Sequence, residues 1–406
     1  MRKKMLFYTL CIASAIFTTL VVIIDTIAST YIEDVWIYGN LSFVYGTIIS
    51  FLIAIIFCVP YKGKKIGRYI DPNFYGIKLI KKEHLNLYMI MAFGNAISTV
   101  GYFYIIAKTL DPAAILPFMQ LVVLYLVMGE ILLERDIPSI VEVQSLVVIV
   151  FGALLASISP TGHIDMSALM IVMTLINGGS TLKIIAQRKM RMIRVDGRRI
   201  DSINIRVWNL LLSTIFFLVI MAIYDPASII GAINASKRLI LIALLSMGIT
   251  FFAKITYIRA LGIGRASITQ AVTSLSVILG IPLTLIAELV IPGVLVPIYG
   301  SPLVFLIKLI GTIMVALGIV TLALSEVRAY ILIRAPRGKG NVILKKVAKI
   351  KGVTYVSAVA GKFDFIVRVK IRTLGKGYRL VVRKLEKIDG IEDFLWLSTL
   401  YEWEEI

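Results

Sequence analysis

The chain has 406 residues, of which 59% are hydrophobic, and its mean hydropathy is +0.91. Ordinary soluble domains are roughly 45–50% apolar, so this composition excludes a soluble globular protein and predicts a membrane protein. The net charge of +19 would suit nucleic acid. Polytopic membrane proteins also collect Lys and Arg in cytoplasmic loops, so we expect membrane lipid as a partner and no nucleic acid.

Apolar segments long enough to cross a bilayer, which takes about 20 residues, follow one another along most of the chain. The first comes after Arg2, Lys3 and Lys4. It runs about 20 residues, longer than the 7–15 of a signal peptide, so we interpret it as a spanning helix. The ten predicted spans are 5–30, 38–60, 86–108, 112–133, 139–159, 165–187, 203–224, 239–261, 266–291 and 302–326.

The charges of the connecting loops predict the orientation of these spans. Lys and Arg gather in 61–85, 188–202 and 327–340, whereas the alternate loops hold little more than Lys237 and Arg238. Basic loops stay on the cytoplasmic side. We therefore expect a multi-pass protein of the cell membrane with both termini in the cytoplasm.

Two stretches of the sequence are approximate copies. Lys254 to Glu288 and Tyr102 to Glu130 each contain Tyr, apolar residues, Ala, Leu, a short turn with two small residues, and a long apolar run closed by Glu. With five spans in each half, the second copy must enter the membrane in the opposite orientation. Residues 1–160 and 161–326 are thus predicted to form an inverted 5+5 repeat, and many secondary transporters bind substrate between such repeats.

The motifs of these halves resemble a known family. The second half, TYIRALGIGRASITQAVTSLSVILGIPLTLIAE followed by KLIGTIMVALGIV, resembles the EamA-type repeat of the drug/metabolite transporter superfamily. The first half resembles it through LPFMQLVVLYLVMGE and VVIVFGALLAS. The resemblance covers about residues 5–326, and it implies an all-α transporter of ten transmembrane helices.

After Glu326 the hydrophobic periodicity changes from a membrane pattern to that of a small domain, 327–406. Strands and helices are recognised by periods of two and 3.6 residues respectively. The order βαββαβ predicts a ferredoxin-like α+β fold. The predicted elements are a strand at 329–335, a helix at 340–350, two strands flanking a turn at Gly361 and Lys362, a helix at 377–388 and a strand at 391–403.

This tail resembles the ligand-binding domain of the leucine-responsive regulator (Lrp/AsnC) family. The motifs are Pro336-Arg337-Gly338, Ile350-Lys351-Gly352-Val353, Gly361-Lys362-Phe363-Asp364 and Ile388-Asp389-Gly390-Ile391. The resemblance implies a homodimer with an effector pocket at Gly361 and Asp364. The alternative is structural: a positive φ at Gly361, and Asp364 accepting from backbone donors. Membrane helix replaces the family's helix-turn-helix, so we expect no DNA binding.

Polar and charged residues inside the predicted spans are the candidates for substrate contact. A charge at a span centre costs about 2.5–3.5 kcal/mol and usually faces a cavity. Lys254 is too deep in its span to snorkel easily and should face a polar cavity, whereas Asp25 could simply be solvated at the interface and Lys183 could reach the interface through its stem. For the uncharged groups, interhelical hydrogen bonds are the alternative. The candidates are Lys254, Gln270, Gln120, Asn95, Asn177, Asp25 and Tyr257.

Signals of enzymatic activity are poor. The only two histidines, His84 and His163, lie in loops, and there is no phosphate-binding P-loop. The partial dinucleotide fingerprint 262–267 joins two apolar helices without a preceding strand, and is a turn. We expect no enzyme, cofactor or metal, but a secondary transporter of a small organic metabolite, amino acids included, with an effector-binding tail. The alternatives are a membrane-embedded sensor without transport and a multidrug or lipid-carrier exporter.

Overall fold

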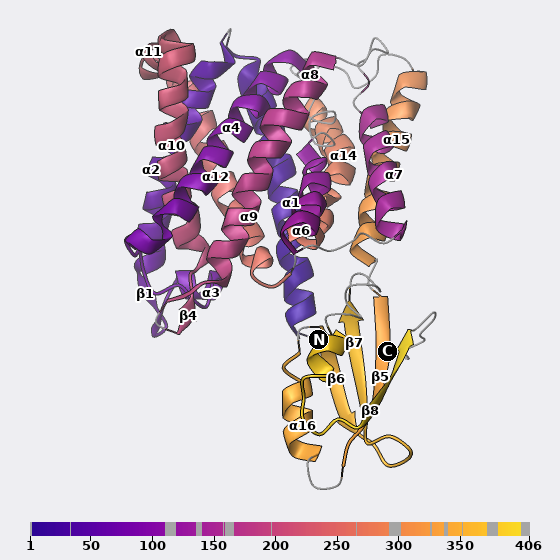
Figure 1. Cartoon of the computed structure of the whole chain (residues 1–406). Coiled ribbons are helices and arrows are strands. Elements are labelled where there is room, and N and C mark those ends of the chain that lie inside the picture. Colours follow the sequence, from indigo (N-terminus) through magenta and orange to yellow (C-terminus); the bar gives the residue numbers. More distant parts are fainter. Residues whose placement is uncertain are drawn as a thin grey trace. The chain divides into compact units, whose positions relative to one another are not determined.

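The computed structural model divides the chain into two compact units (Figure 1). One unit comprises Met1–Val127 and Leu146–Val320, and the other Met128–Ser145 and Thr321–Ile406. The structure describes residues 2–32, 34–109, 119–134, 140–156, 158, 166–195, 197–264, 266–291, 302–324, 327–336, 340–350, 352–371 and 381–398.

The first unit is helical. The division of the chain into units falls within three further helices, at 122–134, 140–156 and 302–324. The connections between helices contain two two-stranded ribbons and the one-turn helix α3 (Gly67–Ile70). The ribbons are β1 (Pro60–Tyr61) with β2 (Lys64–Lys65), and β3 (Arg194–Val195) with β4 (Arg198–Arg199). The longer helices are α1 (Arg2–Ser29), α2 (Val35–Cys58), α4 (Leu85–Thr109), α6 (Val122–Glu134), α7 (Ile140–Ala156), α8 (Met166–Ile171) continuing through a π-helical Val172–Gly178 into α9 (Gly179–Met192), α10 (Ser202–Tyr224), α11 (Pro226–Ile233), α12 (Lys237–Leu261), α13 (Ala266–Thr273), α14 (Leu275–Val290) and α15 (Pro302–Leu324).

Seven helical stretches in the described part are long and apolar enough to cross a membrane. They are Met5–Ser29, Val35–Cys58, Lys82–Ala107, Met166–Met192, Ser202–Tyr224, Lys237–Leu261 and Ala266–Val290. The other three predicted spans coincide with α6, α7 and α15, whose apolar stretches are shorter, and 110–118 lies outside the described residues. Ten spans therefore remain a prediction.

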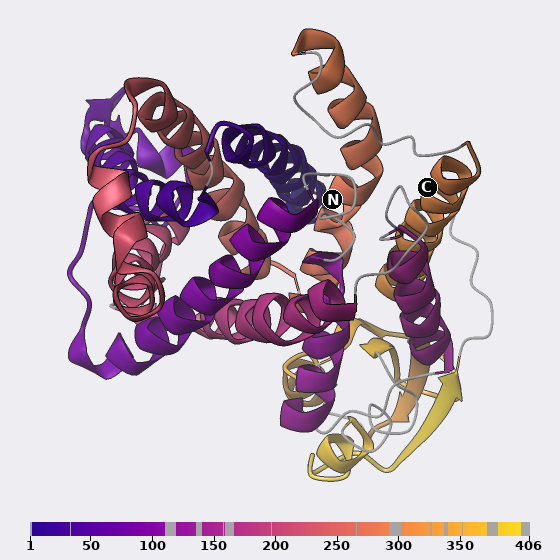
Figure 2. The same cartoon turned by 90° about the horizontal axis from the view of Figure 1, so that it is seen from above.

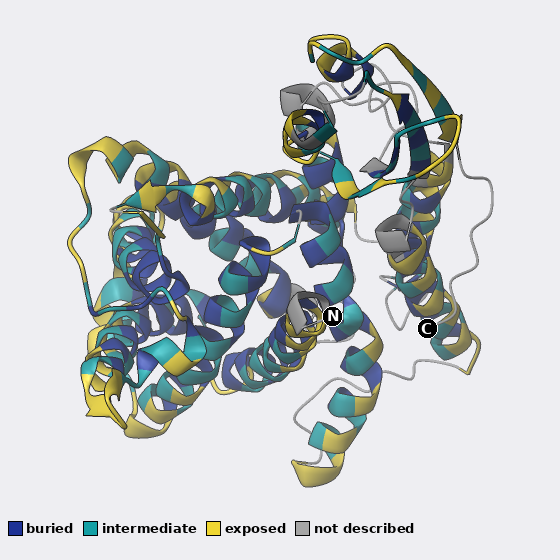
Figure 3. Ribbon diagram, turned by 90° about the horizontal axis from the view of Figure 1, so that it is seen from below, coloured by how far each residue is buried: buried dark blue, intermediate teal, exposed yellow. Residues whose placement is uncertain are grey.

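The outer faces of these helices are apolar, as the inner ones are. On α2 the exposed residues include Ile48, Leu52 and Ile55, and on α12 Leu241 and Leu245. These spacings of three and four place them along one stripe of each helix. Figure 3 shows the buried residues gathered where helices meet. A helix that is hydrophobic all round belongs in a core or a membrane, and here the exposed stripe requires an apolar surrounding.

Helices far apart in the sequence pair closely. α1 lies along α12, α4 along α9, α2 along α12 and α4 along α10; Figure 2 looks down on these helices. The α4–α9 crossing depends on two glycines: a Cβ on Gly94 would lie 2.5 Å from the Gly179 carbonyl oxygen, and one on Gly179 would lie 2.7 Å from that of Gly94. Small residues let backbones approach in this way.

Side-chain caps fix where three of the helices begin. Asp201 accepts from the Asn204 amide at 2.8 Å at the start of α10, and Ser236 accepts from Leu239 at the start of α12. Asp225 caps α11, whose first residue is Pro226. Such side chains satisfy amide donors that have no partner within the helix.

The C-terminal domain contains a four-stranded antiparallel sheet in the order β6-β7-β5-β8. The strands are β5 (Val327–Arg334), β6 (Val353–Ala358), β7 (Phe365–Ile371) and β8 (Asp393–Ser398); α16 (Gly340–Val347) follows β5, and residues 381–385 are helical. This is the predicted βαββαβ order. Residues 372–380 and 399–406, which include parts of the predicted second helix and last strand, lie outside the described residues.

One face of this sheet forms the domain core. Ile331 and Ile333 of β5 are fully buried with Val367 and Val369 of β7. The core also takes in Ile343, Val347, Val381 and Leu385 from the helical segments. Alternate residues point to the opposite face, where Leu395 and Leu397 are 46% and 44% exposed.

Candidate substrate cavity

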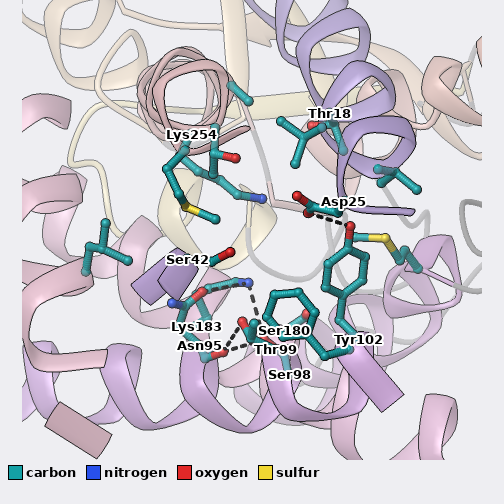
Figure 4. Close-up of a pocket in the computed structure, with 18 of the residues that line it drawn as sticks. Thr18, Asp25, Ser42, Asn95, Ser98, Thr99, Tyr102, Ser180, Lys183 and Lys254 are labelled. Atoms are coloured by element: carbon teal, nitrogen blue, oxygen red, sulfur yellow. Dashed lines mark hydrogen bonds between the residues drawn. The ribbon is translucent and has the colours of Figure 1, made fainter. Parts of the chain in front are cut away.

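A cavity of about 110 Å³ lies among α1, α2, α4, α9, α10 and α12 of the helical unit (Figure 4). Its wall combines apolar groups with charged and hydroxyl side chains. The polar lining residues are Thr18, Asp25, Ser42, Asn95, Ser98, Thr99, Tyr102, Ser180, Lys183, Arg206, Thr250 and Lys254. Such a mixture, apolar with a few convergent polar groups, is typical of a small-molecule site.

Asp25 is buried within the helices and is not solvated at an interface. It is 1% exposed. Tyr38 and Tyr102 donate to its two oxygens at 2.8 and 2.9 Å, and Ser246 donates to Oδ1 as well. The alternative of interfacial solvation is therefore wrong. A carboxylate this deep needs such donors, because unpaired burial costs several kcal/mol or more.

Lys183 of α9 also lines the cavity. Its Nζ donates to Asn95 Oδ1 at 3.3 Å and to Ser98 Oγ at 3.5 Å, both on α4 (Figure 4). Of the two alternatives for Lys183, these contacts favour a place in the cavity wall over an extension of the side chain to the interface.

Lys254 of α12 lines the cavity. The sequence predicts this position, because a lysine deep within a span is expected to face a cavity. Its side chain points toward Asp25 (Figure 4), yet these two described residues form no ion pair with each other. Arg206 of α10 is a further lining base, 3% exposed, that we did not predict as a site residue. Its position inside the predicted span 203–224 is the signal that could have found it.

A smaller cavity of about 70 Å³ shares Thr18, Lys183 and Lys254 with the first. Three predicted residues meet there. Tyr257 Oη donates to Gln270 Oε1 at 2.7 Å, and Gln270 Nε2 donates to Gln120 Oε1 at 2.7 Å. Asn177 is buried elsewhere, in the π-helical turn, and lines neither cavity.

A buried ion pair joins the connections at one end of the helices. Arg191 Nη2 lies 2.7 Å from Asp71 Oδ2, which also accepts from the Ser202 amide and hydroxyl at 2.8 and 2.9 Å. Burial by itself would raise the pKa of Asp71, but Arg191 and these hydrogen bonds outweigh it and hold that pKa below its ordinary value. Sequence alone gave no sign of this pair.

Asp201, which caps α10, has the opposite shift. Burial raises its pKa to about 6, against the lowering effect of the hydrogen bonds from Asn204, and the nearby Asp71 carboxylate adds to the increase.

In the C-terminal domain, Asp364 has the structural role that we considered. Its Oδ2 accepts from the Ala335 amide at 2.8 Å, and its own amide donates to the Ile333 carbonyl at 2.9 Å. Gly361 has a φ of +155°. These contacts fix the connection between β6 and β7 to the end of β5.

Residues 328–396 match the family model of the Lrp/AsnC ligand binding domain. The chain therefore carries an Lrp/AsnC ligand-binding domain at its C-terminus. The described strands and helices of the Lrp/AsnC domain fall in the predicted order, so this resemblance is confirmed. The EamA-type resemblance of the preceding residues remains a prediction, and so do the roles of Gly361 and Asp364 in binding an effector to the Lrp/AsnC domain.

Two crystal structures are similar to parts of the chain. The protein PH0061 is 18% identical over 20% of this chain and 57% of its own length, with a TM-score of 0.19. A second, described only as a protein, is 12% identical over 77% of this chain and 98% of its own, with a TM-score of 0.46. Neither likeness is strong enough to carry an argument. No curated protein matches the chain.

Proposed function

We propose that the helical region is a secondary transporter of a small organic metabolite, with amino acids among the candidates, and that the Lrp/AsnC domain regulates it. The observation that carries this proposal is the charged cavity, which holds Asp25, Lys183, Arg206 and Lys254 among helices that are apolar on their outer faces. Charges inside apolar helices are costly, and they usually mark the path of a substrate or ion.

The helix pairing supports an inverted 5+5 repeat of the EamA type. In the predicted order of ten spans, α1, α4, α9 and α12 would be the first, third, sixth and eighth. Exchanging the two halves turns the α1–α12 pair into α9–α4, and both pairs are in close contact. The bridging glutamines, Gln120 and Gln270, come one from each half. A site between the halves is where such transporters bind substrate.

Regulation rests on the Lrp/AsnC domain and on the open face of its sheet. A ligand-binding domain implies a small-molecule effector. The sheet face opposite the core carries Leu395, Leu397 and, on β6, Tyr355, which is 52% exposed. An exposed apolar face of this kind fits a second copy of the domain. The effector would shift transport only if it binds one conformation more tightly than the other.

Flux in proteoliposomes tests the proposal. The full-length protein, reconstituted and offered a panel of labelled amino acids, organic acids and amines, is expected to show saturable uptake or exchange with at least one class. Protein-free vesicles are the control. Absence of flux across the whole panel would contradict transport.

A membrane-embedded metabolite sensor is the second candidate, since the identified ligand-binding domain is all that such a sensor needs. It predicts effector binding to the full-length protein without any flux. A multidrug or lipid-carrier exporter is distinguished by uptake of apolar cations or lipid-linked compounds in the same panel.

A further inference from the structure

The cavity between the helices contains more positive than negative charge. Lys183, Arg206 and Lys254 line it, and Asp25 is the one carboxylate in its described lining. The three bases lie close enough for their charges to repel one another. An Arg guanidinium stays charged in proteins, so proton loss from the two lysines would still leave Arg206 positive.

Three polar atoms of the cavity wall have unmet hydrogen-bonding capacity within the described structure. They are Arg206 Nε, Ser42 Oγ and Thr250 Oγ1, on residues that are 3%, 1% and 8% exposed. Buried polar atoms nearly always have a partner, so each such atom requires an explanation. All three can donate a hydrogen bond, and all three residues line the same cavity.

Asp25 does not neutralise this excess. Three hydroxyl groups already donate to its oxygens, and it forms no ion pair with Lys254, the base directed toward it. A zwitterion such as a neutral amino acid could place its ammonium near Asp25 and its carboxylate against one base. Two bases would still lack a counter-charge.

We propose that the cavity selects small organic acids of net negative charge, with a carboxylate or phosphate oxyanion held between Lys254 and Arg206. This deepens the proposed transport function and rests on it. Lys183, already bonded to Asn95 and Ser98, adds positive potential from its fixed position. The guanidinium offers a planar pair of donors that suits an oxyanion, and Ser42 and Thr250 supply further donors.

Matched pairs that differ in negative charge test this inference: glutamate against glutamine, succinate against succinamate, and glycerol phosphate against glycerol. Binding to the full-length protein in detergent is measured together with uptake in proteoliposomes. The more negative member of at least one pair is expected to bind about tenfold or more tightly than the less negative member, which corresponds to about 1.4 kcal/mol.

Lys254→Met should reduce that acid preference at least about tenfold, because it removes one partner of a buried charge pair. Lys254→Arg should retain most of it. Lys237→Met, at an exposed position of the same helix, is the matched control and should leave it unchanged. If Lys254→Met does not fold, the inference is decided by the acid preference of the wild-type protein and by the change in that preference in Arg206→Lys.

The outcomes separate this inference from transport itself. Acid-selective binding that depends on Lys254 without flux supports the inference and contradicts transport. Flux in which the less negative analogues equal or exceed the more negative ones overturns the inference and leaves transport standing. Failure of every acid to bind also overturns the inference.

Discussion

At the scale of single residues, neighbouring positions have very different surroundings. Gly178 and Gly179 are adjacent where the π-helical turn meets α9. A Cβ on Gly178 would meet nothing within 4 Å, whereas one on Gly179 would lie 2.7 Å from the Gly94 carbonyl oxygen and 2.8 Å from the Ser98 amide nitrogen. The sequence shows a glycine pair without indicating which member the helix crossing requires.

Gly179→Ala should therefore destabilise the protein, whereas Gly178→Ala should not. Forcing the α4 and α9 backbones apart costs about 1–3 kcal/mol, while Ala in place of an unconstrained helical Gly is neutral or stabilising by up to about 1 kcal/mol. Thermal unfolding in detergent measures both. Equal melting temperatures for the two variants would contradict the close α4–α9 contact.

Asp201 predicts a pH dependence of stability. Burial raises the pKa of Asp201 in the folded protein to about 6. The stabilising contribution of this residue is therefore fully present below the pKa that Asp201 has in the unfolded chain, and it is lost as the pH rises through 6. The loss is of the order of 3 kcal/mol, at about 1.4 kcal/mol for each pKa unit.

Asp201→Asn keeps an acceptor for the Asn204 amide and removes this titration. Its melting temperature should change less between pH 4.5 and 7 than that of the wild-type protein, and most of the difference should appear between pH 4.5 and 6, where the folded protein keeps the proton that the unfolded chain has lost. Asp225→Asn, at the cap of α11, is the control. An unchanged pH profile in Asp201→Asn would refute the assignment.

At the scale of elements, the Asp71–Arg191 pair connects the segment after α3 to the end of α9. Both side chains are almost fully buried, at 0% and 5% exposed. Three connections that are far apart in sequence meet here, since Arg199 also donates to the Gly262 carbonyl at 2.6 Å.

Asp71→Asn should lower the free energy of unfolding by about 3–5 kcal/mol, because it leaves a buried guanidinium without its counter-charge. The double variant Asp71→Asn, Arg191→Met should recover part of that loss. Glu392→Gln, which breaks an exposed pair with Arg334, should cost no more than about 1 kcal/mol. Chemical denaturation of these three variants, of Arg191→Met alone and of the wild-type protein measures these differences, and additive effects of the two buried substitutions would argue against coupling.

At the scale of the whole molecule, the Lrp/AsnC domain predicts association through its open sheet face. Leu395→Asp should weaken dimers of the full-length protein in detergent without unfolding the domain, because the side chain is 46% exposed. Val342→Asp, at a 56% exposed position of α16, is the matched control. Mass measurement by light scattering reads out the result. A dimer that survives Leu395→Asp would exclude this face as the interface.

Hydrophobic periodicity by itself determined much of the secondary structure of this protein. The apolar runs identified the seven described stretches long enough to span a membrane, because the length of such a run is set by the bilayer and not by tertiary contacts. The change of period after Glu326 and the turn at Gly361 identified the βαββαβ order of the Lrp/AsnC domain. Depth within a span was enough to direct attention to Lys254.

Only the tertiary structure decided which polar groups share a cavity. Asp25, Lys183 and Arg206 come from α1, α9 and α10, and their meeting depends on helix crossings such as Gly94 against Gly179. The direction of a side chain around a helix axis depends on the neighbouring helix, which lies at large sequence separation. For that reason Lys183 was left between two alternatives, Arg206 was missed and Asn177 lies outside both cavities, although all three lie in predicted spans that coincide with long apolar helices.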